Sequence, residues 1–204
     1  HGTLAHNKME IIHELQQRLS QAGQDSLAIN LSLGVDNRTS EMYPCATPHR
    51  HQHQDAVAEI GAWLAWAKQQ GVRQVTLVGH SRGGNQAAWA AATLPQSGVD
   101  KLVLLAPMTW TAAAEQDDYQ KRYGKSLDTV RQQANAQQSR AGAESLMQPV
   151  DFIYCPQTVA QTRSVLEYYA PDVRKDTLHW LKTLQLPTLV LVATEDTTVA
   201  DLPA

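Results

Sequence analysis

Apolar residues recur at helical spacing in three segments of the chain, and short β-branched runs lie between them. The spacing predicts helices over residues 8–19, 56–68 and 81–93. The apolar runs predict strands, which are expected over residues 26–33, 74–78, 100–107 and 188–194. Because strands that alternate with helices of this length form a parallel sheet with right-handed crossovers, the pattern predicts an α/β fold.

The segment from residue 108 to residue 184 interrupts this alternation. It is long, polar and rich in glutamine, and helical character is expected over residues 113–123, 127–138, 158–169 and 171–184. The pattern gives the segment no obvious core of its own, which favours an insertion between two core strands over a separate domain. We therefore expect a core over residues 1–107, a helical lid over residues 108–184, and the core again over residues 185–204.

Composition and charge narrow the classes of function. The chain has 17 basic and 20 acidic residues, a formal net charge of −3 and no basic cluster, which argues against nucleic acid or an anionic membrane surface as a partner. No apolar run approaches the roughly 18 residues of a membrane span, so a soluble globular protein is expected. The sequence leaves open the oligomeric state and whether the protein is cytoplasmic, periplasmic or secreted. It begins without an initiator methionine and stops just after an expected strand, so we expect both ends to be truncated.

The two cysteines, Cys45 and Cys155, lie far apart in the sequence, and each is next to a proline. They fit either one disulfide in an oxidising compartment or two buried thiols, because spacing alone does not establish that they are close. The sequence leaves both alternatives open.

The candidate chemistry is concentrated in one motif, Gly79-His80-Ser81-Arg82-Gly83. The motif follows the strand expected over residues 74–78 and opens an alanine-rich helix, which is the context that a nucleophile elbow requires. In such an elbow the serine sits on a strained strand-to-helix turn and the glycines let neighbouring backbone approach. The helix N-terminus adds partial positive charge where an oxyanion would form. The alternative is a tight turn with a solvated serine.

Together with His1-Gly2-Thr3, this elbow resembles the α/β-hydrolase superfamily, many members of which have His-Gly at the end of an early core strand. The resemblance implies a mostly parallel sheet flanked by helices, with a helical lid. It implies Ser81 as the nucleophile and the backbone N–H groups of Thr3 and Arg82 as the oxyanion hole.

The resemblance also implies the position of the remaining triad members. The acid is expected in the turn after the strand that follows the lid, at Asp196, with Glu195 as the fallback. In the superfamily the histidine follows the acid, but residues 197–204 contain none. We therefore expect the histidine beyond Ala204, and we expect the 204 residues alone to be inactive, because a serine needs a base within hydrogen-bond reach.

The histidines that are present have other expected roles. His80 lies inside the elbow and is expected to point away from attack geometry, and His179 is expected to pack or to face solvent. His49, His51 and His53 alternate in a polar loop, for which solvation is the default expectation and zinc binding the alternative. No cysteine or carboxylate completes a metal site at a diagnostic spacing, so no metal is expected.

Clues to the substrate are few. His80, Trp110 and Tyr168 are the candidates for lining a substrate pocket, although aromatic residues at helical spacing more often belong to a core. We interpret the chain as a serine hydrolase that needs no cofactor and cleaves a small-molecule carboxylic ester or thioester through an acyl-enzyme on Ser81. The rival interpretations are acyl transfer or amide cleavage by the same nucleophile, and a scaffold that binds without turnover.

Overall fold

The structure, a computed structural model, describes residues 1–94 and 98–192. The chain forms two compact units, each of which is built from separated segments. Unit 1 consists of His1–Met42, Ala56–Thr109 and Arg174–Ala204, and unit 2 consists of Tyr43–Asp55 and Trp110–Val173. The sequence had placed residues 43–55 in the core, and the structure groups them with residues 110–173.

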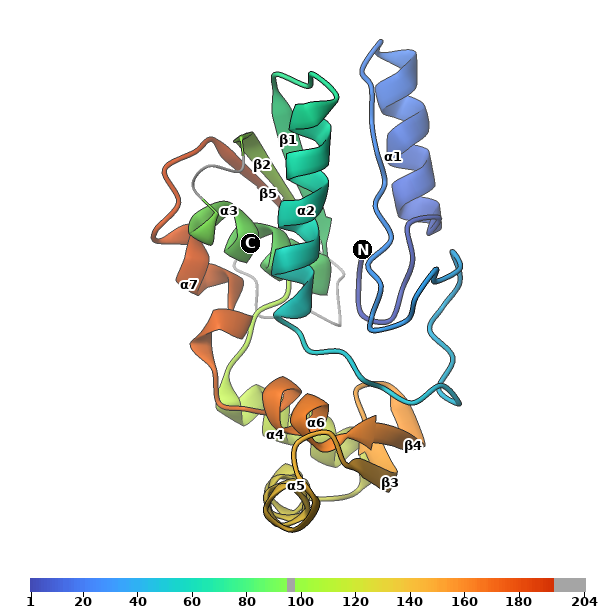
Figure 1. The fold of residues 1–204 in the computed structure, drawn as a ribbon. Coiled ribbons are helices and arrows are strands. Elements are labelled where there is room, and N and C mark those ends of the chain that lie inside the picture. The colour runs from blue at the N-terminus through green and yellow to red at the C-terminus, as the bar shows by residue number, and fades with distance from the viewer. Residues whose placement is uncertain (95–97, 193–204) are drawn as a thin grey trace. The chain divides into compact units, whose positions relative to one another are not determined.

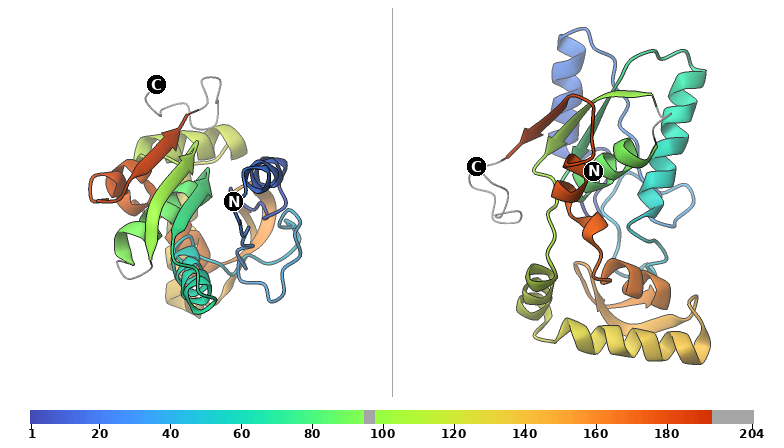
Figure 2. Two further views of the ribbon diagram at one scale, coloured as in Figure 1. Left: turned by 90° about the horizontal axis from the view of Figure 1, so that it is seen from above. Right: turned by 90° about the vertical axis from the view of Figure 1, so that its left-hand side faces the viewer.

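Unit 1 contains a parallel sheet of three strands. These are β1 (Val75–His80), β2 (Val99–Leu105) and β5 (Thr188–Leu191), in the order β1-β2-β5 (Figures 1 and 2). All three were predicted, because buried parallel strands appear in a sequence as short apolar runs. The helix α3 (Arg82–Thr93) follows β1 after a single residue, Ser81. The sheet therefore presents Ser81 at the carboxyl end of its first strand.

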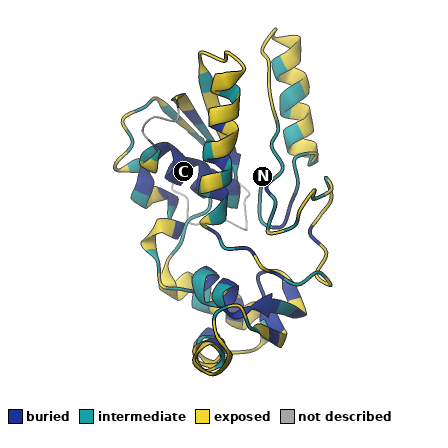
Figure 3. Cartoon of the chain, viewed as in Figure 1, coloured by how far each residue is buried: buried dark blue, intermediate teal, exposed yellow. Residues whose placement is uncertain are grey.

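Small side chains allow α3 to lie close to the sheet. Gly83 to Ala91 are all buried, and Figure 3 shows this part of the helix in the colour of buried residues. One face of α3 packs on Leu102 and Leu104 of β2 and on Trp180 of the short helix α7 (Thr177–Leu181). The rings of Trp89 and Trp180 stack with centroids 5.4 Å apart. The helix α2 (Asp55–Gln69) packs on Ala90 of α3 through its own apolar stripe of Ala56, Ile60 and Leu64. This packing holds the second half of α3 against the sheet, α2 and α7.

The strand expected over residues 26–33 is wrong, since this segment is extended but pairs with no strand in the part of the chain that the structure describes. Side chains bind its backbone instead. The Leu31 N–H donates to Nε2 of His1 at 3.1 Å, and the Ser32 N–H donates to the carboxylate of Glu59 at 2.8 Å. The apolar residues of the segment reflect the burial of Leu31 against α2 rather than a place in the sheet. The helix α1 (Glu10–Gln21) runs alongside this segment (Figure 1).

Unit 2 has a core of its own, contrary to the expectation from the sequence. It contains the helices α4 (Ala112–Tyr123), α5 (Leu127–Ala141) and α6 (Thr162–Tyr168), and a hairpin of β3 (Leu146–Phe152) and β4 (Cys155–Gln161). The residues at its centre are at most 2% exposed, and they are Tyr119, Leu127, Ala134, Phe152, Cys155, Ala160 and Val165.

The helix expected over residues 158–169 is wrong in its first part, because β4 extends to Gln161 and α6 begins only at Thr162. The strand is stabilised by a partner far away in the sequence. The His49 N–H donates to the Val159 carbonyl at 2.9 Å, and the Gln161 N–H donates to the His49 carbonyl at 2.8 Å. A local pattern cannot reveal a partner more than 100 residues away. Of the helix expected over residues 171–184, only the turn η1 (Val173–Lys175) and α7 are helical.

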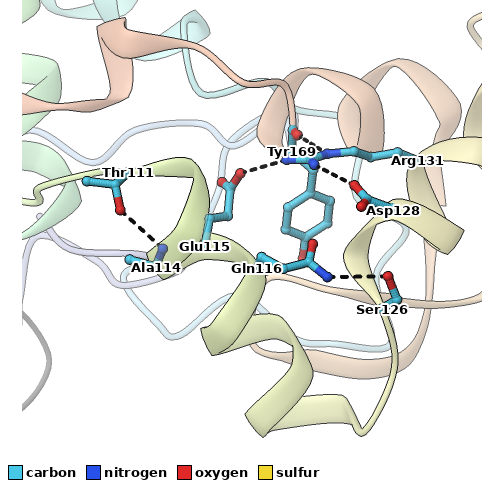
Figure 4. Close-up of polar contacts among 8 residues, drawn as sticks. All are labelled: Thr111, Ala114, Glu115, Gln116, Ser126, Asp128, Arg131 and Tyr169. Carbon is cyan, nitrogen blue, oxygen red and sulfur yellow. Dashed lines mark hydrogen bonds and ion pairs between the residues drawn. The ribbon is translucent and has the colours of Figure 1, made fainter.

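A polar network joins the helices of unit 2 (Figure 4). Arg131 of α5 pairs with Glu115 of α4 at 3.2 Å and with Asp128 of its own helix at 3.0 Å. Its Nε donates to the Tyr169 carbonyl, just after α6, at 2.6 Å. One guanidinium therefore links α4, α5 and the end of α6, as its five donors allow. No helix in the described ranges is long and apolar enough to cross a membrane.

Candidate active site

Ser81 occupies a strained backbone position between β1 and α3. Its φ of 55° and ψ of −125° lie in a region that L residues rarely adopt, at a cost of about 1–3 kcal/mol. Hydrogen bonds on both sides maintain this geometry. The Ser81 N–H donates to the Leu105 carbonyl at 2.9 Å, and the Ser81 carbonyl accepts from the N–H groups of Gly84 and Met108 at 2.8 Å and 3.0 Å. These bonds hold Ser81 on a strained turn between a strand and a helix.

The glycines around Ser81 are required by close approaches of backbone. A Cβ on Gly79 would overlap the carbonyl of Gly83 and would lie 2.7 Å from Cα of Gly84. A Cβ on Gly83 would overlap the carbonyl of His1, and one on Gly84 would lie 2.8 Å from Cβ of Pro107. Each of these distances is shorter than real Cβ contacts, so a side chain at any of the three positions would displace backbone.

The segment His1-Gly2-Thr3 lies against the elbow. A Cβ on Gly2 would be 3.4 Å from Cβ of Ser81 and 3.7 Å from its Oγ, which is ordinary van der Waals contact. The Arg82 side chain donates from Nε to Oγ1 of Thr3 at 2.9 Å. Unit 1 therefore brings together four of the residues that the sequence selected, namely Thr3, His80, Ser81 and Arg82. Asp196 and its fallback Glu195 lie outside the described residues.

Comparison with known proteins identifies the fold family. A family model described as the alpha/beta hydrolase fold matches residues 1–201. The chain belongs to the α/β-hydrolase fold family.

Solved structures of other α/β-hydrolases have the same fold. A monoacylglycerol lipase from Paleococcus ferrophilus aligns over 95% of this chain and 71% of its own, with 16% identity and a TM-score of 0.55. A structure from a study of carboxylesterases of Nitrososphaera gargenis aligns over 97% of this chain and 72% of its own, with 15% identity and a TM-score of 0.52. At these identities the likeness establishes the fold alone.

A short stretch of the chain is also similar in sequence to another protein. A protein of Mycoplasma pneumoniae, named as a candidate esterase/lipase, is 42% identical over 48 residues. The match spans 24% of this chain and only 18% of that protein. The proteins that these comparisons name are lipases and esterases, while the activity of the whole protein is a matter for proposal.

The structure also gives the positions of the other candidate residues. His179 lies on α7, where its ring meets Trp180 edge to face at a centroid distance of 4.8 Å. Trp110 and Tyr168 belong to unit 2. Tyr168 is 4% exposed, its hydroxyl is 2.8 Å from Nδ1 of His51, and its ring meets Phe152 edge to face.

The expectation of a solvated loop at the three alternating histidines is wrong. His49, His51 and His53 are at most 1% exposed and lie in the core of unit 2. Nδ1 of His49 is 3.2 Å from Nε2 of His51. The other ring nitrogen of His51 makes the hydrogen bond to the Tyr168 hydroxyl, so the three side chains form a continuous chain of hydrogen bonds. The period of two was the signal in the sequence, because alternate residues of an extended segment face the same side. Among the described residues no group of histidine, cysteine and carboxylate side chains is arranged to hold a metal.

The histidine cluster makes the stability of unit 2 sensitive to acid. Burial lowers the pKa of His49 to about 4, whereas an unfolded histidine has a pKa of about 6.5. Between about pH 4 and pH 6.5, His49 is therefore protonated in the unfolded chain and neutral in the folded unit. The free energy of unfolding has its full value above about pH 6.5 and falls as the pH decreases toward 4. We expect urea denaturation to give a free energy of unfolding lower by roughly 2 kcal/mol at about pH 4.5 than at about pH 7.

Two variants test the origin of this loss. His49→Asn keeps a polar atom near the position of Nδ1 but does not titrate, so its stability should depend less on pH. His13→Asn, at an exposed position on α1, should keep the slope of the wild type. An unchanged slope in His49→Asn would assign the acid sensitivity to other groups.

The open question of the two cysteines is answered by the structure. Cys45 and Cys155 form a disulfide with a Cα–Cα distance of 5.2 Å. The bond joins the segment before α2 to the first residue of β4, and both ends lie in unit 2. It therefore ties the two chain segments of this unit together.

Proposed function

We propose that this α/β-hydrolase cleaves a carboxylic ester or thioester of a small or medium acyl group through an acyl-enzyme on Ser81. The observation that carries the proposal is the strained Ser81 backbone, with a φ of 55° and a ψ of −125°, between β1 and α3. A partly exposed serine on such a turn at the start of a helix supports acyl transfer as the proposed chemistry. The names of the related lipases and esterases support an ester as the substrate.

The proposed reaction has two halves. Oγ of Ser81 attacks the acyl carbonyl while a histidine takes the serine proton, and the N–H groups of Thr3 and Arg82 stabilise the oxyanion. The histidine returns the proton to the leaving alkoxide or thiolate, which departs as the acyl-enzyme forms. Water then attacks the acyl-enzyme with the same histidine as base, which releases the acid and restores Ser81. Asp196, or Glu195 in its place, is proposed to orient that histidine, and the scheme needs no cofactor.

Labelling with a fluorophosphonate tests the proposal directly. The activated serine oxygen should attack phosphorus and expel fluoride, leaving one adduct per chain in the intact mass of the full-length protein. Trypsin should locate this adduct on residues 74–82, QVTLVGHSR, in which Ser81 is the only serine. Heat-denatured protein is the control and should stay unmodified. A folded, full-length protein without an adduct would contradict the nucleophile and would favour a binding scaffold.

A further inference from the structure

The hydrogen bond between Arg82 and Thr3 joins two segments that meet only through the fold. The two residues are 79 positions apart, and Nε of Arg82 lies 2.9 Å from Oγ1 of Thr3. Both side chains are partly buried. The proposed oxyanion hole takes one backbone N–H from each of these residues, so the bond links the two halves of that hole.

The direction of this hydrogen bond is fixed by chemistry. A guanidinium has five donors and no acceptor and stays protonated at any working pH, so the Thr3 hydroxyl must accept. A bond from an ionised donor is stronger than a neutral one and holds its geometry better. The pair is therefore suited to maintaining the distance between the two residues.

The segment that carries Thr3 also bends and packs next to Ser81 through its backbone. It bends back at Leu4, which has a φ of 54°, and the Ala5 N–H donates to the Gly2 carbonyl at 3.2 Å. The His1 side chain binds Leu31 rather than the elbow. Close packing of the His1 backbone on Gly83 limits the approach of the two segments, but packing alone does not prevent sliding. The directional hydrogen bond from Arg82 to Thr3 restricts sliding of the two segments along each other.

We propose that the side chains of Arg82 and Thr3 form a positioning pair that sets the separation of the two oxyanion donors. This inference rests on the proposed function. The pair touches no reacting atom; it acts through the backbone N–H groups of the same two residues. Losing the side-chain bond leaves both N–H groups chemically intact but misplaced, and misplacement by about 1 Å costs on the order of 100-fold in rate.

A kinetic double-mutant cycle tests the pair in the full-length protein. Thr3→Val removes the acceptor at nearly constant volume, and Arg82→Met removes the donor but keeps a long side chain. Each single variant should lower kcat about 10- to 100-fold with a smaller change in KM, because the donors act most strongly in the transition state. The double variant should lose about as much as either single variant, since both break the same bond. Thr3→Ser, which keeps the hydroxyl, should stay within about threefold of the wild type.

A second readout separates positioning from simple destabilisation. The affinity for a trifluoromethyl ketone, which forms a tetrahedral adduct on the serine, should fall in parallel with kcat/KM across the series. Thr93→Val and Arg73→Met are the matched controls, because they remove the same groups at exposed positions away from the elbow. Both controls should keep wild-type kinetics, and all folded variants should unfold at similar temperatures.

The outcomes distinguish this inference from the function on which it rests. An active wild type with an inactive Ser81→Ala variant, but with unchanged kcat in Thr3→Val, overturns the positioning pair alone. Independent losses that multiply in the double variant also overturn it. A folded wild type that neither turns over esters nor reacts with the fluorophosphonate overturns the proposed function and the pair with it.

Discussion

Replacing Ser81 with alanine is expected to lower kcat/KM for ester hydrolysis by about 10⁴- to 10⁶-fold, because removal of a catalytic serine leaves only binding and oxyanion stabilisation. Alanine has to adopt the same φ of 55° and ψ of −125°, so the backbone strain and the stability of the variant should stay near those of the wild type. The measurement is the initial rate on p-nitrophenyl esters and matched thioesters, with thermal unfolding on the same samples.

A second substitution at this position separates the loss of the Ser81 hydroxyl from the effect of the strained backbone. Ser81→Gly should be equally inactive but more stable by about 1 kcal/mol or more, since glycine adopts a positive φ without the steric cost. Ser26→Ala, at an exposed position at the start of the extended segment, is the control and should keep full activity. Hydrolysis that survives in both Ser81 variants would assign the activity to another group.

Loss of the disulfide is expected to destabilise unit 2 by about 2–5 kcal/mol. The bond closes a loop across 110 positions and holds the segment before α2 against β4, where Oγ1 of Thr158 also donates to the Cys45 carbonyl at 2.5 Å. Without it, that segment has more freedom in the unfolded state, and the buried Cys155 side chain loses its partner. Hydrogen exchange of the β4 amides should accelerate in a Cys45→Ser variant and under reducing conditions.

The amides of α3 in unit 1 serve as the internal reference for this experiment. Their exchange should change much less than that of β4, because α3 packs on β2, α2 and α7. A Cys45→Ala, Cys155→Val double variant removes the thiols without leaving a polar group in the core, and it should reproduce the effect of reduction. Unchanged β4 exchange in all three conditions would contradict a stabilising role for the bond.

The sequence predicted best where the signal was local. The three parallel strands and α3 were confirmed to within a few residues, because buried apolar runs and an alanine-rich stripe carry their own pattern. The strand expected over residues 26–33 failed because the side chains of His1 and Glu59 bind its backbone. The hairpin of β3 and β4 was missed because each strand contains a proline and polar residues, which weaken a strand pattern. The bridge from β4 to His49 could not be predicted either, since the two lie more than 100 positions apart. Pairing between distant segments has no local signature.

The residues of the candidate site show the same difference between local and long-range signals. Ser81 could be selected from five consecutive residues, since an elbow is specified by its own glycines and flanking elements. The hydrogen bond between Arg82 and Thr3 could not be predicted from the sequence, because it depends on how the fold brings together residues 79 positions apart. The burial of the histidine trio had a signal in its period of two, but the partners that bury it, such as Phe152 and Tyr168, come from other elements.

The division of unit 2 into two chain segments restricts how this part of the protein can be exchanged between relatives. A chimaera that receives only residues 110–173 of this protein would carry Cys155 without Cys45 and would lack the three buried histidines. Recombination that preserves folding therefore needs two pairs of crossover points, one pair around residues 43–55 and the other around residues 110–173. Substitutions in the two segments should accordingly be inherited together.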